Sequence, residues 1–254
     1  MSSYHSHHIR SEKYEIQIPK PSSALVYGGL LTFIGGVILL IAFASPYWLA
    51  SFEDTRTETA FNNMGLWEYC FDDYRHPNYQ FDKLFTGCHY VYSKEYHIIR
   101  EWLLPGWMLA VQTFFTLAFM ASLGTQILLA ALVVRWPLGI VIQNEWILTF
   151  ISCLGNATAA FMILLSVAIF GANFDRRDWL QYPNYNYLSW SYAFAVGTMF
   201  VHGLAAIALY VESKEAKERT IEGEGHLALQ MHPTGPGSTV GGMSNPGSEA
   251  QHYM

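Results

Sequence analysis

Cysteine is the residue type whose spacing in this sequence points most directly to a covalent bond. Cys70 and Cys88 are separated by 17 residues, whereas the third cysteine, Cys153, lies within a long apolar run. Two cysteines in one polar segment pair in an oxidising compartment and stay reduced if that segment faces the cytoplasm. Such a bond stabilises the loop that it closes by about 3 kcal/mol in the chain-entropy model. Whether Cys70 and Cys88 form a disulfide or stay as free thiols therefore depends on the side of the membrane on which this segment lies.

The remaining polar residues predict no catalytic or metal site. His5, His7 and His8 stand close together near the start of the chain, but no second ligand cluster accompanies them. Glycine-rich phosphate loops, zinc-ligand spacings and Ser/His/Asp sets are missing from the polar segments. We therefore expect no catalytic residue, no cofactor and no metal ligand, and we expect that the protein is not an enzyme.

The composition indicates an integral membrane protein. Of the 254 residues, 52% are hydrophobic and only 13% are charged, whereas globular proteins carry about 25% charged residues. The apolar residues form four runs that are long enough to cross a bilayer as helices, at about residues 24–44, 103–134, 146–171 and 189–211. A soluble enzyme and a disordered chain are excluded. The net charge of −6 and the scattered basic residues also argue against nucleic acid as a partner.

Basic residues near the span ends predict the orientation. They gather before the first span, after the fourth and in the short segment between the second and third, which favours a cytoplasmic location for all three: Arg10, Lys13, Lys20, Arg135, Lys214, Lys217 and Arg219. Residues 1–23 are then a cytoplasmic segment, and residues 45–102 and 172–188 are outer loops. Residues 212–254, charged and then rich in Gly, Pro and Ser, are expected to be a disordered cytoplasmic tail. Cys70 and Cys88 then lie outside the cell and are expected to pair.

The large outer loop has the composition of a small antiparallel sheet. Segments rich in Trp, Tyr, Phe and Val favour strands at residues 47–52, 66–71 and 89–92. Turns are predicted between them at Asn62-Asn63, at residues 75–78 and at Thr86-Gly87. The predicted fold is an all-α membrane protein, a four-helix transmembrane bundle. A small extracellular antiparallel sheet, formed mainly by the first outer loop and linked by a disulfide, completes it.

Several residues of this loop carry a family resemblance. Trp48, the run Gly65-Leu66-Trp67 and the two cysteines follow the pattern W…GLWxxC…C. This pattern resembles the first loop of the claudin family and its relatives, the peripheral myelin protein group and the calcium-channel gamma subunits. The four spans and the large first loop match as well, over about residues 24–211. The long gap between the cysteines is most similar to divergent invertebrate claudin-like proteins of septate junctions.

The resemblance implies a role for each residue of the pattern. Trp48 would pack beside the membrane, Gly65, Leu66 and Trp67 would hold the loop on the helix ends, and Cys70–Cys88 would be the disulfide. Arg100 matches an arginine that precedes the second span in claudins. The ending Tyr253-Met254 is similar to the claudin ending that binds PDZ domains of junction scaffold proteins.

The resemblance also implies a function. The protein would be a structural component of lateral cell–cell junctions in the plasma membrane, where it helps to form a paracellular diffusion barrier. Its partners would be other copies or claudin-like proteins, in cis within one membrane and in trans across the gap, together with membrane lipids. The alternative is an auxiliary subunit that modulates an ion channel or receptor. With nine acidic and five basic residues in the large loop, an ordinary solvated face and a cation-favouring surface both stay open.

Polar residues inside the spans are few, and none is Asp, Glu, Lys or Arg. Gln126, Asn156 and His202 are the exceptions, and we expect them to form hydrogen bonds within the bundle, with a ligand site as the alternative. Gly28, Thr32 and Gly36 recur every four residues and favour close helix contact. We expect this contact within one bundle and not between chains.

Overall fold

A computed structural model of the chain describes residues 21–52, 60–76, 83–180 and 182–230. Residues 1–216 form one unit, which holds a helix bundle and a sheet, and residues from 217 onward form a second unit. The predicted terminal features, His5, His7 and His8 and the ending Tyr253-Met254, lie outside the described residues.

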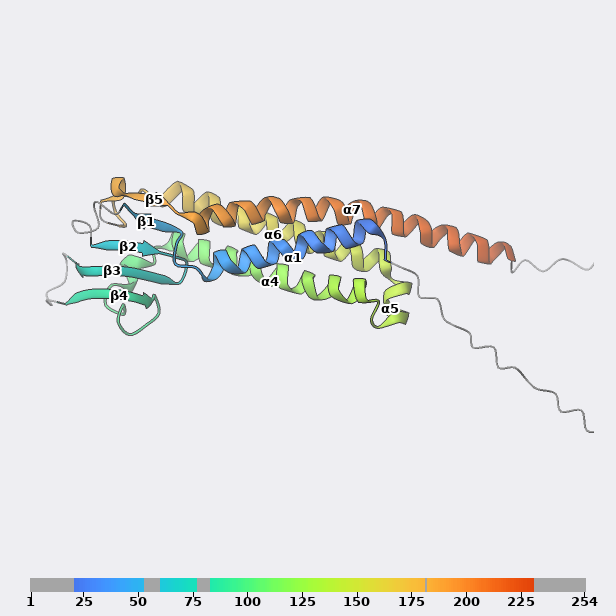
Figure 1. Cartoon of the computed structure of the whole chain (residues 1–254), viewed down its shortest axis with the longest axis horizontal. Coiled ribbons are helices and arrows are strands. Elements are labelled where there is room, and N and C mark those ends of the chain that lie inside the picture. The colour runs from blue at the N-terminus through green and yellow to red at the C-terminus, as the bar shows by residue number, and fades with distance from the viewer. Residues whose placement is uncertain (1–20, 53–59, 77–82, 181, 231–254) are drawn as a thin grey trace, which may run out of the picture. The chain divides into compact units, whose positions relative to one another are not determined.

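Four long helices form the bundle (Figure 1), and each is long and apolar enough to cross a membrane, which confirms the four predicted spans. They are α1 (Ser23–Ala44), α4 (Gly106–Val134), α6 (Glu145–Asn173) and α7 (Trp190–Gln230). Short helices lie between them at α3 (Arg100–Leu103), α5 (Leu138–Gln143) and the 3-10 turn η2 (Pro183–Tyr185).

The helix ends differ from the predicted spans at two places, each with a local cause. The second span does not begin at residue 103, because Pro105 lacks a backbone N–H, takes the N-cap position and separates α3 from α4. The fourth helix continues to Gln230, so the prediction of a disordered tail from residue 212 is wrong over residues 212–230. This stretch contains Glu, Lys and Ala, which are good helix formers.

The bundle carries one five-stranded antiparallel sheet, with the order β4-β3-β2-β1-β5. Its strands are β1 (Leu49–Ser51), β2 (Phe61–Met64), β3 (Glu68–Arg75), β4 (Leu84–Tyr90) and β5 (Asn186–Leu188). Four strands come from the first predicted outer loop, which confirms the predicted sheet. The fifth, β5, belongs to the second loop and pairs with β1 at Leu49↔Leu188 and Ser51↔Asn186.

Two of the predicted turns are wrong. Asn62 and Asn63 lie within β2, where the pairing with β3 shifts register, and Thr86 and Gly87 lie within β4. Gly87 has a φ of 90°, a backbone conformation that glycine adopts at low cost. A Thr-Gly pair is typical of a turn, but here the glycine permits an irregular strand instead.

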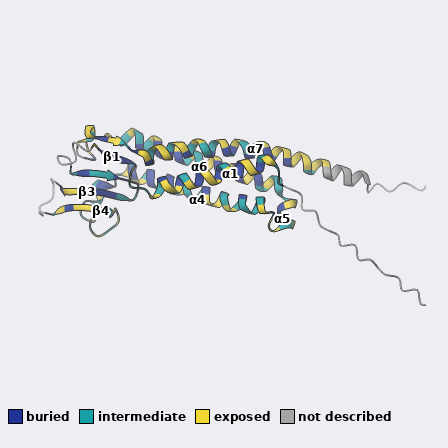
Figure 2. Ribbon diagram, in the orientation of Figure 1, coloured by how far each residue is buried: buried dark blue, intermediate teal, exposed yellow. Residues whose placement is uncertain are grey.

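One continuous core joins the sheet to the bundle. Buried aromatic side chains of the sheet region and of the helices belong to the same cluster, and Figure 2 shows the buried residues running from the strands into the helices. Its largest fully buried members include Trp48, Tyr69, Phe71, Phe115 and Phe170. The sheet is thus fixed to the helix ends by packing.

A chain of polar side chains links all four long helices inside the bundle. Asn156 of α6 accepts hydrogen bonds through Oδ1 from Thr32 of α1 (3.2 Å) and contacts Nδ1 of His202 of α7 at 2.8 Å. The other ring nitrogen of His202 lies 3.3 Å from Oγ of Ser122, which accepts from Gln126 Nε2 at 3.1 Å within α4. The three polar exceptions in the spans are therefore satisfied within the bundle, as expected.

Small residues of α1 let the neighbouring helices approach. A Cβ on Gly28 would lie 2.8 Å from Cδ2 of Leu209, and a Cβ on Gly36 would collide with the amide of Gln126. The face formed by Gly28, Thr32 and Gly36 therefore packs within one bundle. At the end of the bundle away from the sheet, Arg135 pairs with Glu145 and joins the end of α4 to the start of α6.

Candidate functional site

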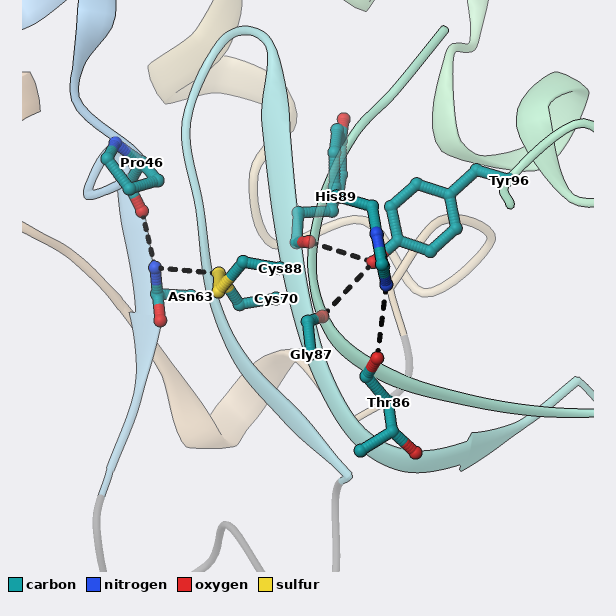
Figure 3. The surroundings of a disulfide bond; sticks show 9 residues. Pro46, Asn63, Cys70, Thr86, Gly87, Cys88, His89 and Tyr96 are labelled. Carbon is teal, nitrogen blue, oxygen red and sulfur yellow. Dashed lines mark hydrogen bonds between the residues drawn. A yellow bond between two sulfur atoms is a disulfide. The ribbon is translucent and has the colours of Figure 1, made fainter. Parts of the chain in front are cut away.

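The disulfide joins two neighbouring strands at the centre of the candidate site. Cys70 of β3 and Cys88 of β4 are directly opposite in the ladder, with their Cα atoms 4.0 Å apart, and their sulfurs are bonded. Cys70 is buried, whereas Cys88 is exposed. Figure 3 shows Asn63 beside the bond, where its Nδ2 donates to Pro46 O at 2.7 Å and contacts Cys70 Sγ at 3.5 Å. The predicted pairing is confirmed.

Trp48 lies where the first strand leaves the first helix, and it is fully buried. Its indole N–H donates to Ala42 O at 2.8 Å, one of the carbonyls that the end of a helix leaves without an internal partner. Its ring packs edge-on against Phe115 of α4 and Phe170 of α6, both with centroids 5.1 Å away. The structure therefore places Trp48 between three spans, directly beneath the sheet.

Gly65, Leu66 and Trp67 cross the helix ends between β2 and β3. A Cβ on Gly65 would collide with the carbonyl oxygen of Ser45, so the backbone at residue 65 passes very close to the end of α1. Leu66 is fully buried, and the ring of Trp67 lies 5.3 Å from that of Phe43 of α1. The structure brings all three together on the ends of the spans.

A buried glutamine, which the sequence analysis did not identify, holds the same segment from below. Gln112 of α4 is 4% exposed, and its Nε2 donates to Leu66 O at 2.6 Å. Its Oε1 accepts from the hydroxyl of Tyr92 at 3.2 Å. Gln112 carries an amide group inside a membrane span, and a strongly polar group at such a position was the signal that could have identified it.

Arg100 closes the segment that follows β4. From the start of α3, its guanidinium donates to three consecutive carbonyls, those of Val91 (3.3 Å), Tyr92 (3.2 Å) and Ser93 (3.1 Å). Arginine suits this task because its planar fork of N–H donors stays charged. The half-buried Arg100 thus fixes the backbone of residues 91–93 in place.

Buried tyrosines connect the sheet to the helices. The hydroxyl of Tyr69 donates to Leu103 O at 3.0 Å, and that of Tyr96 donates to Tyr69 O at 2.8 Å. Burial raises the pKa of both hydroxyls above 10, so both keep the protons that these bonds need. The indole N–H of Trp179, from the second loop, also points to Leu103 O at 3.3 Å. One carbonyl therefore ties the two loops together, a link that no local pattern predicted.

Two ion pairs lie in the described parts of the loops. Lys83 lies 3.0 Å from Glu95, and Arg176 lies 2.7 Å from Asp178 in the second loop. The hydrogen bonds from Arg176 hold the pKa of the Asp178 carboxyl below its usual value. Four of the nine acidic residues of the large loop, Glu53, Asp54, Glu58 and Asp82, lie outside the described residues.

One close set of metal-type side chains occurs in the part of the chain that the structure describes. A carboxylate oxygen of Glu68 lies within 4.8 Å of the sulfurs of Cys70 and Cys88. Both sulfurs are joined to each other and offer no thiolate, and thiolates are what such a site would need. The two sulfurs therefore form a structural disulfide and are not metal ligands.

Large apolar side chains remain exposed on two edges of the sheet. On the β5 side, Phe52 is 50% exposed and lies against Tyr187, with ring centroids 4.9 Å apart. On the β4 side, Leu84, Tyr90 and Tyr92 are between 42% and 51% exposed. Exposed aromatic groups on a rigid frame can make a contact surface.

The comparison with known families agrees with this arrangement. Residues 33–211, more than half of the chain, match the family described as "PMP-22/EMP/MP20/Claudin tight junction". No curated protein matches the sequence. The matched range contains the last part of α1, the other three spans as far as Val211, and the whole disulfide-linked sheet. The chain is therefore a multi-pass membrane protein that belongs to the PMP-22/EMP/MP20/claudin tight-junction family.

Proposed function

We propose that this protein is a structural component of lateral cell–cell junctions and helps to form a paracellular diffusion barrier. Its outer loops would contact further copies or other claudin-like proteins, in cis within one membrane and in trans across the intercellular gap. Both termini would lie in the cytoplasm. Family membership supports a tight-junction type of protein, and the shape of the sheet region supports the finer assignment.

The observation that carries the proposal is a rigid frame that presents exposed aromatic rings. The Cys70–Cys88 bond joins β3 to β4 within the sheet, and the buried Trp48 and the shared Leu103 carbonyl hold the sheet on the bundle. A surface that is already ordered loses little conformational entropy on binding, so more of its contact energy appears as affinity.

The exposed rings lie where a neighbouring molecule could reach them. Tyr47, Phe52 and Tyr187 are 40%, 50% and 41% exposed at the β1–β5 side of the sheet. Aromatic residues anchor protein interfaces more often than other types. Because β5 ends the sheet, this side also presents a strand edge to a partner.

A polarised epithelium offers the direct test. We expect a tagged copy to concentrate at lateral cell–cell contacts, and cells that lack the protein to leak a small tracer between them. The paired variant Phe52→Ser with Tyr187→Ser should reach the membrane but fail to restore the barrier. The matched pair Phe52→Tyr with Tyr187→Phe keeps both rings and should restore it.

Two results would contradict the proposal. One is an unaltered tracer barrier and normal junction ultrastructure in cells that lack the protein. The other is a distribution that follows an ion channel instead of the lateral contacts, which would support the auxiliary-subunit function. Deletion of Tyr253-Met254 tests the proposed scaffold contact separately, because loss of PDZ binding should leave the outer loops unchanged.

A further inference from the structure

A groove of about 290 Å³ lies where the first loop meets the start of α4. Trp67 and Tyr92 line it from the loop, and α4 supplies Leu109, Gln112, Thr113, Thr116 and Leu117. The groove therefore begins among residues of the sheet region and continues along the surface of a membrane span.

One end of the groove is polar and uncharged. Gln112 is 4% exposed and bonds to both Leu66 O and the Tyr92 hydroxyl. Because the Tyr92 hydroxyl gives its proton to Gln112, its oxygen can still accept a hydrogen bond. The indole N–H of Trp67 is buried and has no hydrogen-bond partner among the described residues. A buried donor in this state is unusual in folded proteins.

The other end of the groove is apolar. There Leu117 is 49% exposed on α4, as expected for a side chain that faces lipid. The hydroxyls of Thr113 and Thr116 donate to carbonyls of their own helix. At a rise of about 1.5 Å per residue, Leu117 lies roughly 16 Å along the helix from Gly106. This distance is about half of a ~30 Å hydrocarbon core. The groove thus covers one leaflet, with its polar end toward the sheet.

We propose that this groove binds a membrane sterol, with the hydroxyl beside Tyr92 and Gln112 and the ring system along Thr116 and Leu117. The order of polar and apolar groups in the groove is the order in which a sterol lies in a leaflet. A sterol has one uncharged polar group, and the rings of Trp67 and Tyr92 provide flat apolar surface for a rigid ring system.

The charges nearby favour a sterol over a phospholipid. None of the groove residues is ionised, whereas recognition of a phosphate usually relies on Lys or Arg. The guanidinium of Arg100 lies over the Tyr92 ring, 5.7 Å from its centroid, but donates to the carbonyls of residues 91–93. A second groove between α1 and α4, lined by Val26, Gly29, Phe33 and Val133 among others, has no such polar end and suits acyl chains.

The test uses the full-length protein in phosphatidylcholine vesicles that contain a photoactivatable sterol. After illumination, mass spectrometry of peptides locates the label. We expect it on residues 109–117 or beside Tyr92, with an at least fivefold loss on addition of unlabelled sterol. Thr113→Trp should fill the groove and lower the labelling at least fivefold. Tyr92→Phe, which removes one hydroxyl, should lower it about threefold.

Leu164→Trp is the matched control. Leu164 is 45% exposed on another span, α6, and does not line the groove, so its variant should label like the wild type. Intact Cys70–Cys88 bonds and equal melting temperatures show that the variants fold. Equal labelling of Thr113→Trp and Leu164→Trp would overturn the proposal. So would displacement of the sterol by a phosphatidylcholine analogue at equal concentration, or a label confined to Val26, Gly29 and Phe33. None of these readouts depends on a role in junctions.

Discussion

The close passage of the chain at Gly65 gives the sharpest test of how the sheet is fixed to the bundle. In Gly65→Ala, the new Cβ would lie 2.7 Å from Pro46 Cα, whereas ordinary contacts begin at 3.4 Å. It would also collide with the Ser45 carbonyl. All of these neighbours are backbone atoms, so no side chain can rotate away, and the β2–β3 connection must move from the end of α1 by at least about 0.7 Å.

The cost of this movement can be worked from the contacts that it disturbs. Overpacking of this kind costs about 1–3 kcal/mol. Two short hydrogen bonds cross the same gap, from Trp48 N to Met64 O (2.8 Å) and from Asn63 Nδ2 to Pro46 O (2.7 Å). Each contributes about 0.5–1.5 kcal/mol net. If both are lost, Gly65→Ala should lower the free energy of unfolding by about 2–6 kcal/mol.

Reversible unfolding of the full-length protein in mixed micelles, followed by tryptophan fluorescence, measures this difference. Gly106→Ala is the matched control, because a Cβ at residue 106 meets nothing within 4 Å. A Gly65→Ala protein that unfolds within about 0.5 kcal/mol of Gly106→Ala, the range typical of surface changes, would refute the reasoning. Such a result would mean that the β2–β3 connection has space for a Cβ atom at residue 65, contrary to the structure.

Three further predictions concern separate parts of the molecule. Replacing Cys70 and Cys88 together by Ser should cost about 2–5 kcal/mol, measured by thermal unfolding, with reduced delivery to the cell surface. Asn156→Leu removes the partner that Thr32 and His202 share and should cost about 1–3 kcal/mol, measured by the same micelle titration. Burial lowers the pKa of His76 below 6.5, so protonation favours the unfolded state, and stability should fall as the pH drops below about 6.5. His76→Gln should flatten that dependence.

Each of these has a contradicting result. A Cys70→Ser, Cys88→Ser protein with an unchanged melting temperature would show that packing alone holds β3 to β4. An Asn156→Leu protein as stable as the wild type would mean that the polar chain contributes nothing net to the bundle. If stability did not depend on pH between 7.5 and 5.5 (roughly the range over which His titrates), the burial of His76 would have no energetic effect.

The length of the apolar runs and the positions of the cysteines were sufficient to predict the four spans and the disulfide. The four spans follow from the near absence of charged residues in four segments, because a bilayer tolerates few such groups. The pairing of Cys70 with Cys88 was predicted from their place in one loop that the basic residues near the span ends put outside the cell. These features are local in the sequence or depend on composition, so no tertiary information was needed.

The features that were missed depend on contacts between distant segments. Nothing near Asn186 indicates that it pairs with Ser51 of β1, and nothing near Trp179 indicates that its indole reaches Leu103. The turn predicted at Thr86-Gly87 failed because Gly87 adopts its positive φ inside a strand. The expected roles of five residues were taken from a resemblance: Trp48, Gly65, Leu66, Trp67 and Arg100. The Gly65→Ala variant above measures how much the role of Gly65 contributes to the free energy of unfolding.

The position of β5 in the chain has a consequence for biosynthesis. Asn186 follows its partner Ser51 by 135 residues, and His202 of α7 arrives later still. At about 5–20 residues per second, a ribosome needs roughly 7 to 27 s between the two strands. During that time the edge of β1 is open on one side of the membrane. Once Asn156 is made, its side chain waits a further 46 residues, roughly 2 to 9 s, for His202 within the lipid. A truncated chain that ends before residue 186 would keep both defects permanently, and both would expose it to chaperones and degradation.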